Sequence, residues 1–203
     1  MCNKNWMACL SALLVLMLMA CGPQQEQQQA NAEEASAEEA NAAPHSEMAE
    51  TGNRGTAEAM FGECKVSIDY GRPKLQGRDM LAKATDGMVW RMGMNEATEI
   101  TSTCDLQFGE TTVPQGHYSL FAKKVTGDQW ELLFNEKTGM WGAPTPKEGF
   151  VATVPLAYST GADSAEAFTI ALEAVDEESG MLKATWGAAV LSAEFSVAGG
   201  DME

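Results

Sequence analysis

Apolar and polar residues alternate along several short segments between residues 61 and 199. The alternation is clearest at residues 66–70, 113–125, 130–134 and 168–172. A period of two residues predicts strands that bury one face. Weaker patterns of the same kind predict further strands at residues 88–92, 99–104, 150–156, 181–186 and 190–197.

Turn-forming residues separate these segments. Gly109, Gly116 and Gly127 each have a proline or acidic residue within two positions, and residues 176–180 are rich in Asp, Glu, Ser and Gly. A helical turn fits only residues 77–84. Eight to ten short strands without a strand–helix–strand rhythm predict an all-β fold, either an antiparallel β-sandwich or a jelly-roll-like barrel. We expect one such domain over residues 61–199, with a short tail at 200–203.

The N-terminus has a different pattern. Residues 10–20, LSALLVLMLMA, form an apolar run of the length of a secretory signal, and the run ends at Cys21-Gly22. The sequence around Cys21 resembles the lipobox of bacterial lipoproteins, in which the cysteine is acylated. We therefore expect a lipoprotein signal peptide at residues 1–20 and a lipid anchor on Cys21. A cleaved signal without a lipid, or an uncleaved anchor helix, is the alternative.

The acylated Cys21 would make a lipid bilayer the first partner of the protein. It would also place the protein outside the cytoplasm, on a bacterial membrane, with the outer membrane or a periplasmic face as the expected site. The segment that follows, through residue 60, is rich in Gln, Ala and Glu and has no aromatic residue before Phe61. Such a composition cannot bury enough apolar area to fold, so residues 21–60 predict an acidic, disordered tether.

The chain is strongly acidic, with a formal net charge of −16. Nucleic acid requires a cationic surface, so we expect no nucleic-acid partner. The charge is not uniform, however. Residues 65–91 contain six Lys and Arg residues against three Asp residues, which concentrates positive charge in one part of the predicted domain.

Two cysteines, Cys64 and Cys104, lie inside the predicted domain. An oxidising compartment would allow them to form a disulfide, provided that the strands beginning at Cys64 and ending at Cys104 are antiparallel neighbours. Separate buried thiols are the alternative.

Four segments resemble the bacterial secreted family known as domain of unknown function 2911. They are IDYGRPKLQGRDML (68–81), VWRMGMNEAT (89–98), VPQGHYSLF (113–121) and WELLFNEKTGMWG (130–142), in the family's order and spacing. The chain departs from the family pattern at Met92, Met94, Gln115, His117 and Gly139-Met140. The resemblance implies an extracytoplasmic β-rich domain and brings no known activity.

The polar residues of these segments are the candidates for a ligand site. They are Asp69, Tyr70, Arg72, Arg78, Arg91, Asn95 and Glu96. A buried guanidinium needs a carboxylate, so Asp69 or Glu96 could pair with Arg72 or Arg91 in a purely structural network. Alternatively, one arginine, helped by Asn95 and Tyr70, stays available for a carboxylate, a phosphate or a sugar hydroxyl. The ligand would be a small molecule, a glycan or a protein.

Enzymatic activity has little support in the sequence. The only histidines are His45, in the predicted tether, and His117, beside a turn, and no nucleotide or metal motif occurs. We therefore expect no cofactor and no metal, and a binding or structural module rather than an enzyme. A glycan-acting hydrolase that uses Asp69 and Glu96 as its two acids is the alternative function. The series Met88, Met92 and Met94 is interpreted as core packing, and so are the aromatic residues of the strands. An aromatic platform for a sugar, formed by Trp90, Trp141, Tyr118 and Phe121, is the alternative for the aromatic residues.

Overall fold

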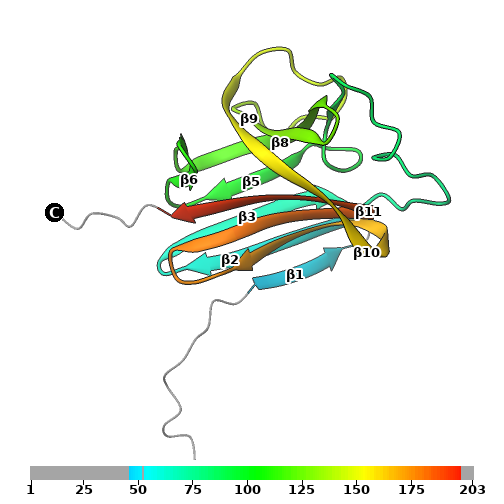
Figure 1. Ribbon diagram of the computed structural model, residues 1–203. Coiled ribbons are helices and arrows are strands. Elements are labelled where there is room, and N and C mark those ends of the chain that lie inside the picture. Colours follow the sequence, from blue (N-terminus) through cyan, green and yellow to red (C-terminus); the bar gives the residue numbers. More distant parts are fainter. Residues whose placement is uncertain (1–45, 52, 198–203) are drawn as a thin grey trace, which may run out of the picture. The chain divides into compact units, whose positions relative to one another are not determined.

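The computed structural model describes residues 46–51 and 53–197, all of which form strands, turns or loops (Figure 1). No helix occurs in these two ranges, and so none that could cross a membrane. The strands are β1 (Ser46–Thr51), β2 (Arg54–Phe61), β3 (Cys64–Gly71), β4 (Val89–Trp90), β5 (Thr98–Ser102), β6 (Leu106–Phe108), β7 (Thr111–Val113), β8 (Gly116–Thr126), β9 (Gln129–Asn135), β10 (Phe150–Ala174) and β11 (Ser179–Val197).

All strand pairs are antiparallel and follow one hydrogen-bonded path, β1-β2-β3-β5-β8-β9-β10-β11-β6-β7, with β4 beside β8. Strand β10 lies between β9 and β11 in this path and pairs with each of them through a different part of its length. Its residues 150–156 pair with β9, whereas its later residues, from Ala157 to Ala174, pair with β11. Figure 1 shows β10 crossing from the layer that contains β8 and β9 to lie beside β11.

Side chains from the two ends of the path meet in one core. Phe61 of β2 packs edge-on against Phe195 of β11, with ring centroids 5.2 Å apart. Across the same core, the Tyr70 hydroxyl of β3 donates to the carbonyl of Ile170 in β10, at 3.2 Å. The path therefore folds over on itself, which confirms the predicted antiparallel β-sandwich.

The folded domain starts earlier than predicted. We expected a disordered tether through residue 60, but β1 and β2 lie within residues 46–61 and pair along their whole length. Before Phe61, the inward residues of β2 are Gly55, Ala57 and Ala59, which are buried but too small to give a hydrophobic pattern. The predicted boundary at residue 61 was therefore wrong. Residues 1–45, which include Cys21 and most of the predicted tether, and 198–203 lie outside the described residues.

Two other local predictions differ from the structure. Residues 77–84 form turns rather than a helical turn, with one hydrogen bond from the Ala84 N–H to the Leu81 carbonyl. The short hairpin of β6 and β7 was not predicted, apart from its turn at Gly109. The predicted strands at 150–156 and 168–172 are parts of one strand, β10, whose polar middle has irregular pairing with β11.

A disulfide joins Cys64 and Cys104, whose Cα atoms are 5.6 Å apart. It forms where β3 begins and just after β5 ends, because these strands are antiparallel neighbours. The bridge closes the chain segment that carries β4, the pairing strand β5 and the long loop between β3 and β4.

Candidate functional site

The segment between β4 and β5 is a tight, irregular turn. Met92 and Asn95 have positive φ angles of 50° and 63°, which residues other than glycine rarely adopt. The Thr98 hydroxyl donates to the Met92 carbonyl at 2.6 Å and holds the turn closed. Gly71 lies against the backbone of Met94, where a Cβ atom would come within 2.8 Å of the Met94 nitrogen. Only a glycine at position 71 allows this approach.

A second segment, residues 140–142, closes the other side of this turn. The Ala97 N–H donates to the Met140 carbonyl at 3.0 Å, and the Gly142 N–H donates to the Asn95 carbonyl at 2.9 Å. The aliphatic part of Arg91 lies directly over Gly142, because a Cβ on Gly142 would meet the Arg91 Cδ at 2.5 Å. Backbone contacts on both sides therefore fix the direction of the Arg91 side chain.

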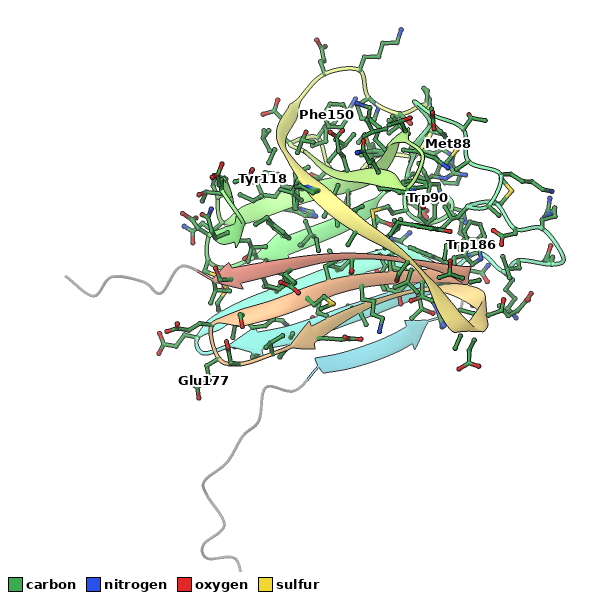
Figure 2. The ribbon with its side chains drawn as sticks, in the orientation of Figure 1. Met88, Trp90, Tyr118, Phe150, Glu177 and Trp186 are labelled. Carbon is green, nitrogen blue, oxygen red and sulfur yellow. A yellow bond between two sulfur atoms is a disulfide. The ribbon has the colours of Figure 1, made fainter. Side chains whose placement is uncertain are left out.

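Arg91 and Arg78 line one pocket of about 300 Å³. Its apolar wall consists of Leu75, Met80, Leu81, Met88, Trp90, Met94 and Trp186. Trp90 and Trp186 stack with ring centroids 5.7 Å apart and an interplanar angle of 13°. Figure 2 shows Met88, Trp90 and Trp186 on the same side of the domain. The structure thus brings two of the predicted arginines together with an aromatic pair.

The charged groups of this pocket are all cationic. Lys74, Arg78 and Arg91 line it, and no Asp or Glu does so among the described residues. The Arg78 Nη2 donates a long hydrogen bond to the Gln76 amide oxygen, at 3.5 Å. Within residues 46–51 and 53–197, Arg91 forms no ion pair or hydrogen bond with any side chain. Asp79, which is close in sequence, accepts a hydrogen bond from the Ala82 N–H at 2.9 Å.

Trp186 contains an unusual buried polar group. The residue is 6% exposed, and its Nε1 is buried without a hydrogen-bond partner in the described part of the chain. A buried donor without an acceptor costs about 1–3 kcal/mol. Because the Nε1 atom itself is buried, Trp186 lines the pocket with the apolar part of its indole.

Asp69 and Glu96 lie elsewhere and share one partner, Arg54. The Arg54 Nε donates to Asp69 Oδ1 at 2.7 Å, and its Nη2 contacts the same oxygen. The Arg54 Nη1 donates to Glu96 Oε2 at 3.1 Å. Neither carboxylate lines the arginine pocket. The sequence assigned Arg54 to the tether, so this partner was missed.

The other three predicted residues lie in the core or form backbone hydrogen bonds; they are Tyr70, Arg72 and Asn95. Tyr70 is 2% exposed and packs edge-on against Phe168, so it belongs to the core. The aliphatic part of Arg72 covers Gly55, and its backbone N–H donates to the Asn53 carbonyl at 2.8 Å. Asn95 contributes its carbonyl to the pairing with Gly142. None of these three residues lines the arginine pocket.

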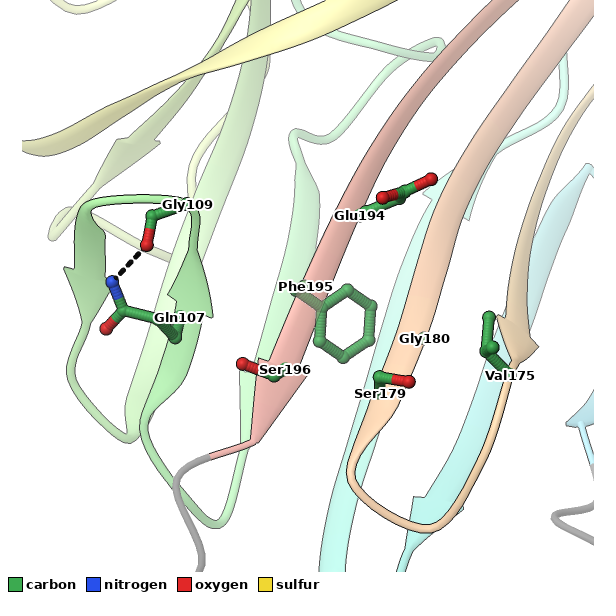
Figure 3. A pocket seen from close by; sticks show the side chains of 8 residues that line it. All are labelled: Gln107, Gly109, Val175, Ser179, Gly180, Glu194, Phe195 and Ser196. Carbon is green, nitrogen blue, oxygen red and sulfur yellow. Dashed lines mark hydrogen bonds between the residues drawn. The ribbon is translucent and has the colours of Figure 1, made fainter.

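Another hollow of about 400 Å³ lies between the β6–β7 hairpin and the end of β11 (Figure 3). Gln107 and Gly109 form one side, where the Gln107 amide donates to the Gly109 carbonyl at 2.6 Å. Glu194 is its only charged lining residue among those described. No residue from the predicted site reaches it. In the described ranges, no group of three or more His, Cys, Asp or Glu residues could hold a metal ion.

A family model described as "Protein of unknown function (DUF2911)" matches residues 52–195. These residues run from the start of β2 to the last residues of β11 and include the whole arginine pocket. No curated protein and no solved structure matches the chain. Because the family model covers well over half of the sequence, the chain belongs to the DUF2911 family.

Proposed function

We propose that this protein is a lipid-anchored, extracytoplasmic module that binds a small anionic ligand with a flat apolar body in the arginine pocket. This proposal rests on the surroundings of Arg91. Arg91 lines a pocket beside two stacked tryptophans, and its guanidinium has no carboxylate partner among the described residues.

The electrostatics of the pocket favour an anion. A guanidinium presents a planar set of donors that matches a carboxylate or a phosphate. Three cations without a lining acid create a local positive potential in a chain whose formal net charge is −16. A cleft with low-dielectric walls concentrates such a potential. A diffusing anion would therefore meet repulsion over most of the protein and attraction at this pocket.

The walls of the pocket favour an apolar body on the same ligand. Ligand pockets are mostly apolar and carry a few placed polar groups, and this pocket has that composition. A flat ring or a short chain would lie along the Trp90 and Trp186 walls with its charge toward Arg91.

The lipid anchor rests on the sequence alone, whereas the compartment is supported by the sequence and by the disulfide. The apolar run ending at Cys21-Gly22 supports acylation of Cys21. The bond between Cys64 and Cys104 agrees with an oxidising compartment. Labelling with a radioactive fatty acid, compared between the natural chain and Cys21→Ser, tests the anchor. Absence of a Cys21-dependent label would refute it.

Nothing in the geometry favours the glycan-hydrolase alternative. Asp69 and Glu96 converge on the same guanidinium instead of facing each other across a cleft. A paired-carboxylate hydrolase needs room for a sugar between its two acids. The positions of Asp69 and Glu96 therefore favour the binding function over the hydrolase.

Arg91→Met tests the binding proposal. The probe is phenyl phosphate, with benzyl alcohol as its uncharged counterpart. A ligand that binds the native state raises its stability by RT ln(1 + [L]/Kd), so the melting temperature reports binding. We expect phenyl phosphate to raise the melting temperature of the natural chain and not that of Arg91→Met. Lys147→Met removes an exposed cation outside the pocket and is the matched control, which should keep the shift.

The same variant separates a binding role from a structural one. Because Arg91 has no ion-pair partner in the described residues, the free energy of unfolding of Arg91→Met should lie within about 0.5 kcal/mol of the natural value. A loss of about 3–5 kcal/mol is expected when one partner of a buried ion pair is removed, and would refute the proposal. The absence of any shift by phenyl phosphate with the natural chain would also refute it.

A further inference from the structure

The outer face formed by β2, β3, β5 and the start of β8 is mostly polar. The alternate residues of β2, β3 and β5 point away from the core, whereas on β8 this holds only for its first residues, because residues 119–122 are all buried. On this face Asp69 lies directly opposite Glu99 in the pairing of β3 with β5. The next row brings His117 of β8 opposite Thr101, and the His117 Nε2 lies 2.8 Å from Glu99 Oε2.

Trp141 stands at one end of this face and is 57% exposed. It pairs with Glu96 in an isolated antiparallel bridge. The backbone hydrogen bonds run between the flanking residues, from the Ala97 N–H to the Met140 carbonyl and from the Gly142 N–H to the Asn95 carbonyl. Trp141 and Glu96 are therefore a non-hydrogen-bonded pair. In such a pair the Cα atoms are about 4.5 Å apart and the two side chains lie close together on one face. The indole is therefore placed beside the Glu96 carboxylate, and Glu96 in turn contacts Arg54.

The carboxylates of this face are arranged at a cost to stability. Like charges directly opposite on neighbouring strands destabilise a sheet, and Asp69 and Glu99 are such a pair. Separate partners hold them: Arg54 contacts Asp69, and the Gly139 N–H donates to Glu99 Oε1 at 2.6 Å. Departures from favourable pairing that are supported by neighbouring groups are expected at functional sites.

We infer that this face, with Trp141 at its end, is a binding site for a neutral glycan. The exposed indole offers a flat apolar surface to the C–H face of a sugar ring. Glu96, Asp69 and Glu99 accept hydrogen bonds from hydroxyl groups, and Arg54 donates them in a planar fork. A sugar is the common ligand that has both an apolar ring face and closely spaced hydroxyls.

The surroundings of Trp141 select this ligand over others. The binding core of a protein–protein interface is poor in charged residues. Trp141, by contrast, pairs with Glu96, which contacts the Arg54 guanidinium. The three acids also disfavour a polyanion. This site shares no residue with the linings of the described pockets. Its test is therefore independent of the test of the anion site in the proposed function.

Affinity gel electrophoresis tests the inference. The natural chain is run in native gels that contain laminarin, xylan, galactomannan or hydroxyethylcellulose, with a gel without polysaccharide as reference. We expect at least one neutral polysaccharide to retard the protein. Trp141→Ala should weaken the retardation about tenfold, which corresponds to the upper range of an aromatic contact. Val175→Ala, which shortens another exposed apolar side chain, is the matched control and should migrate like the natural chain.

The outcomes are distinct. Retardation that is weakened about tenfold in Trp141→Ala, kept in Val175→Ala and weakened in Asp69→Asn supports the site, provided that circular dichroism shows folded variants. The absence of retardation in all four gels overturns it, as does retardation that Trp141→Ala leaves unchanged. Stronger retardation by polygalacturonate than by any neutral polysaccharide also overturns it. A dimer that Trp141→Ala converts to a monomer, without any retardation, would identify the face as a contact between two copies.

Discussion

Removal of the disulfide between Cys64 and Cys104 should strongly destabilise the domain. The bridge joins residues separated by 40 positions. In the chain-entropy model, closing such a loop lowers the entropy of the unfolded chain by about 13 cal/mol/K, which corresponds to about 4 kcal/mol at 25 °C. For a domain of this size, each kcal/mol shifts the melting temperature by about 2–4 °C. Reduction should therefore lower the melting temperature by roughly 8–16 °C.

Urea unfolding of the oxidised and the reduced protein measures this effect. The variant Cys64→Ala/Cys104→Ala, with and without reductant, is the control. It keeps Cys2, Cys9 and Cys21, so any response to reductant that comes from those cysteines would appear in the variant as well. We expect the reductant to lower the stability of the natural chain toward that of the variant and to leave the variant unchanged. Equal unfolding midpoints for the oxidised and reduced natural chain would refute the loop-closure argument.

Two further predictions concern single residues. Gly71→Ala should lower the free energy of unfolding by about 3 kcal/mol, because its Cβ would meet the Met94 backbone. Gly109→Ala is the control, because no atom lies within 4 Å of its Cβ and only the positive φ of 57° is strained. Its cost, measured by urea unfolding, should be about 1 kcal/mol. A Gly71→Ala variant as stable as Gly109→Ala would contradict this account. At the β10–β11 turn, hydrogen bonds from the Ser179 side chain and the Glu178 N–H lower the pKa of Asp176. Its contribution to stability should be complete above the ordinary aspartate pKa and be lost as the pH falls through the lowered value. NMR titration should find that lowered pKa, and Ser179→Ala should raise it toward the ordinary range; an Asp176 pKa that Ser179→Ala leaves unchanged would contradict the assignment.

The part of the fold that the sequence predicted is the part in which large apolar residues alternate. Strands β3 and β9 were visible because Val66, Ile68, Trp130 and Leu132 mark their buried faces. Strand β2 was hidden because its inward positions before Phe61 are glycine and alanine, which pack closely without raising the hydrophobicity of the segment. Burial by small residues depends on how near the opposite layer comes, and a single sequence does not contain that distance.

The candidate site shows the same limit for side-chain partners. Arg78 and Arg91 were predicted as one cluster because they occur in neighbouring motifs, and both line the pocket. Arg54, the partner of Asp69 and Glu96, was missed because a short-range charge pattern does not reveal pairing across strands. The role of Trp186 was equally hidden, since its position beside Trp90 arises from the return of β11 to the other layer. Trp141 was interpreted as core from its motif, but the structure places it at the surface.

The passage of β10 from one layer to the other sets the order in which the pocket can form. Arg91 belongs to the turn between β4 and β5, whereas Trp186 arrives with β11, the last strand of the chain. Contacts between residues so far apart in sequence form only after the entropy of the intervening chain has been lost. A nascent or partly folded chain would therefore contain the arginines without the second tryptophan. The pocket is complete only when the C-terminal hairpin has docked, so a bound ligand would report that folding has finished.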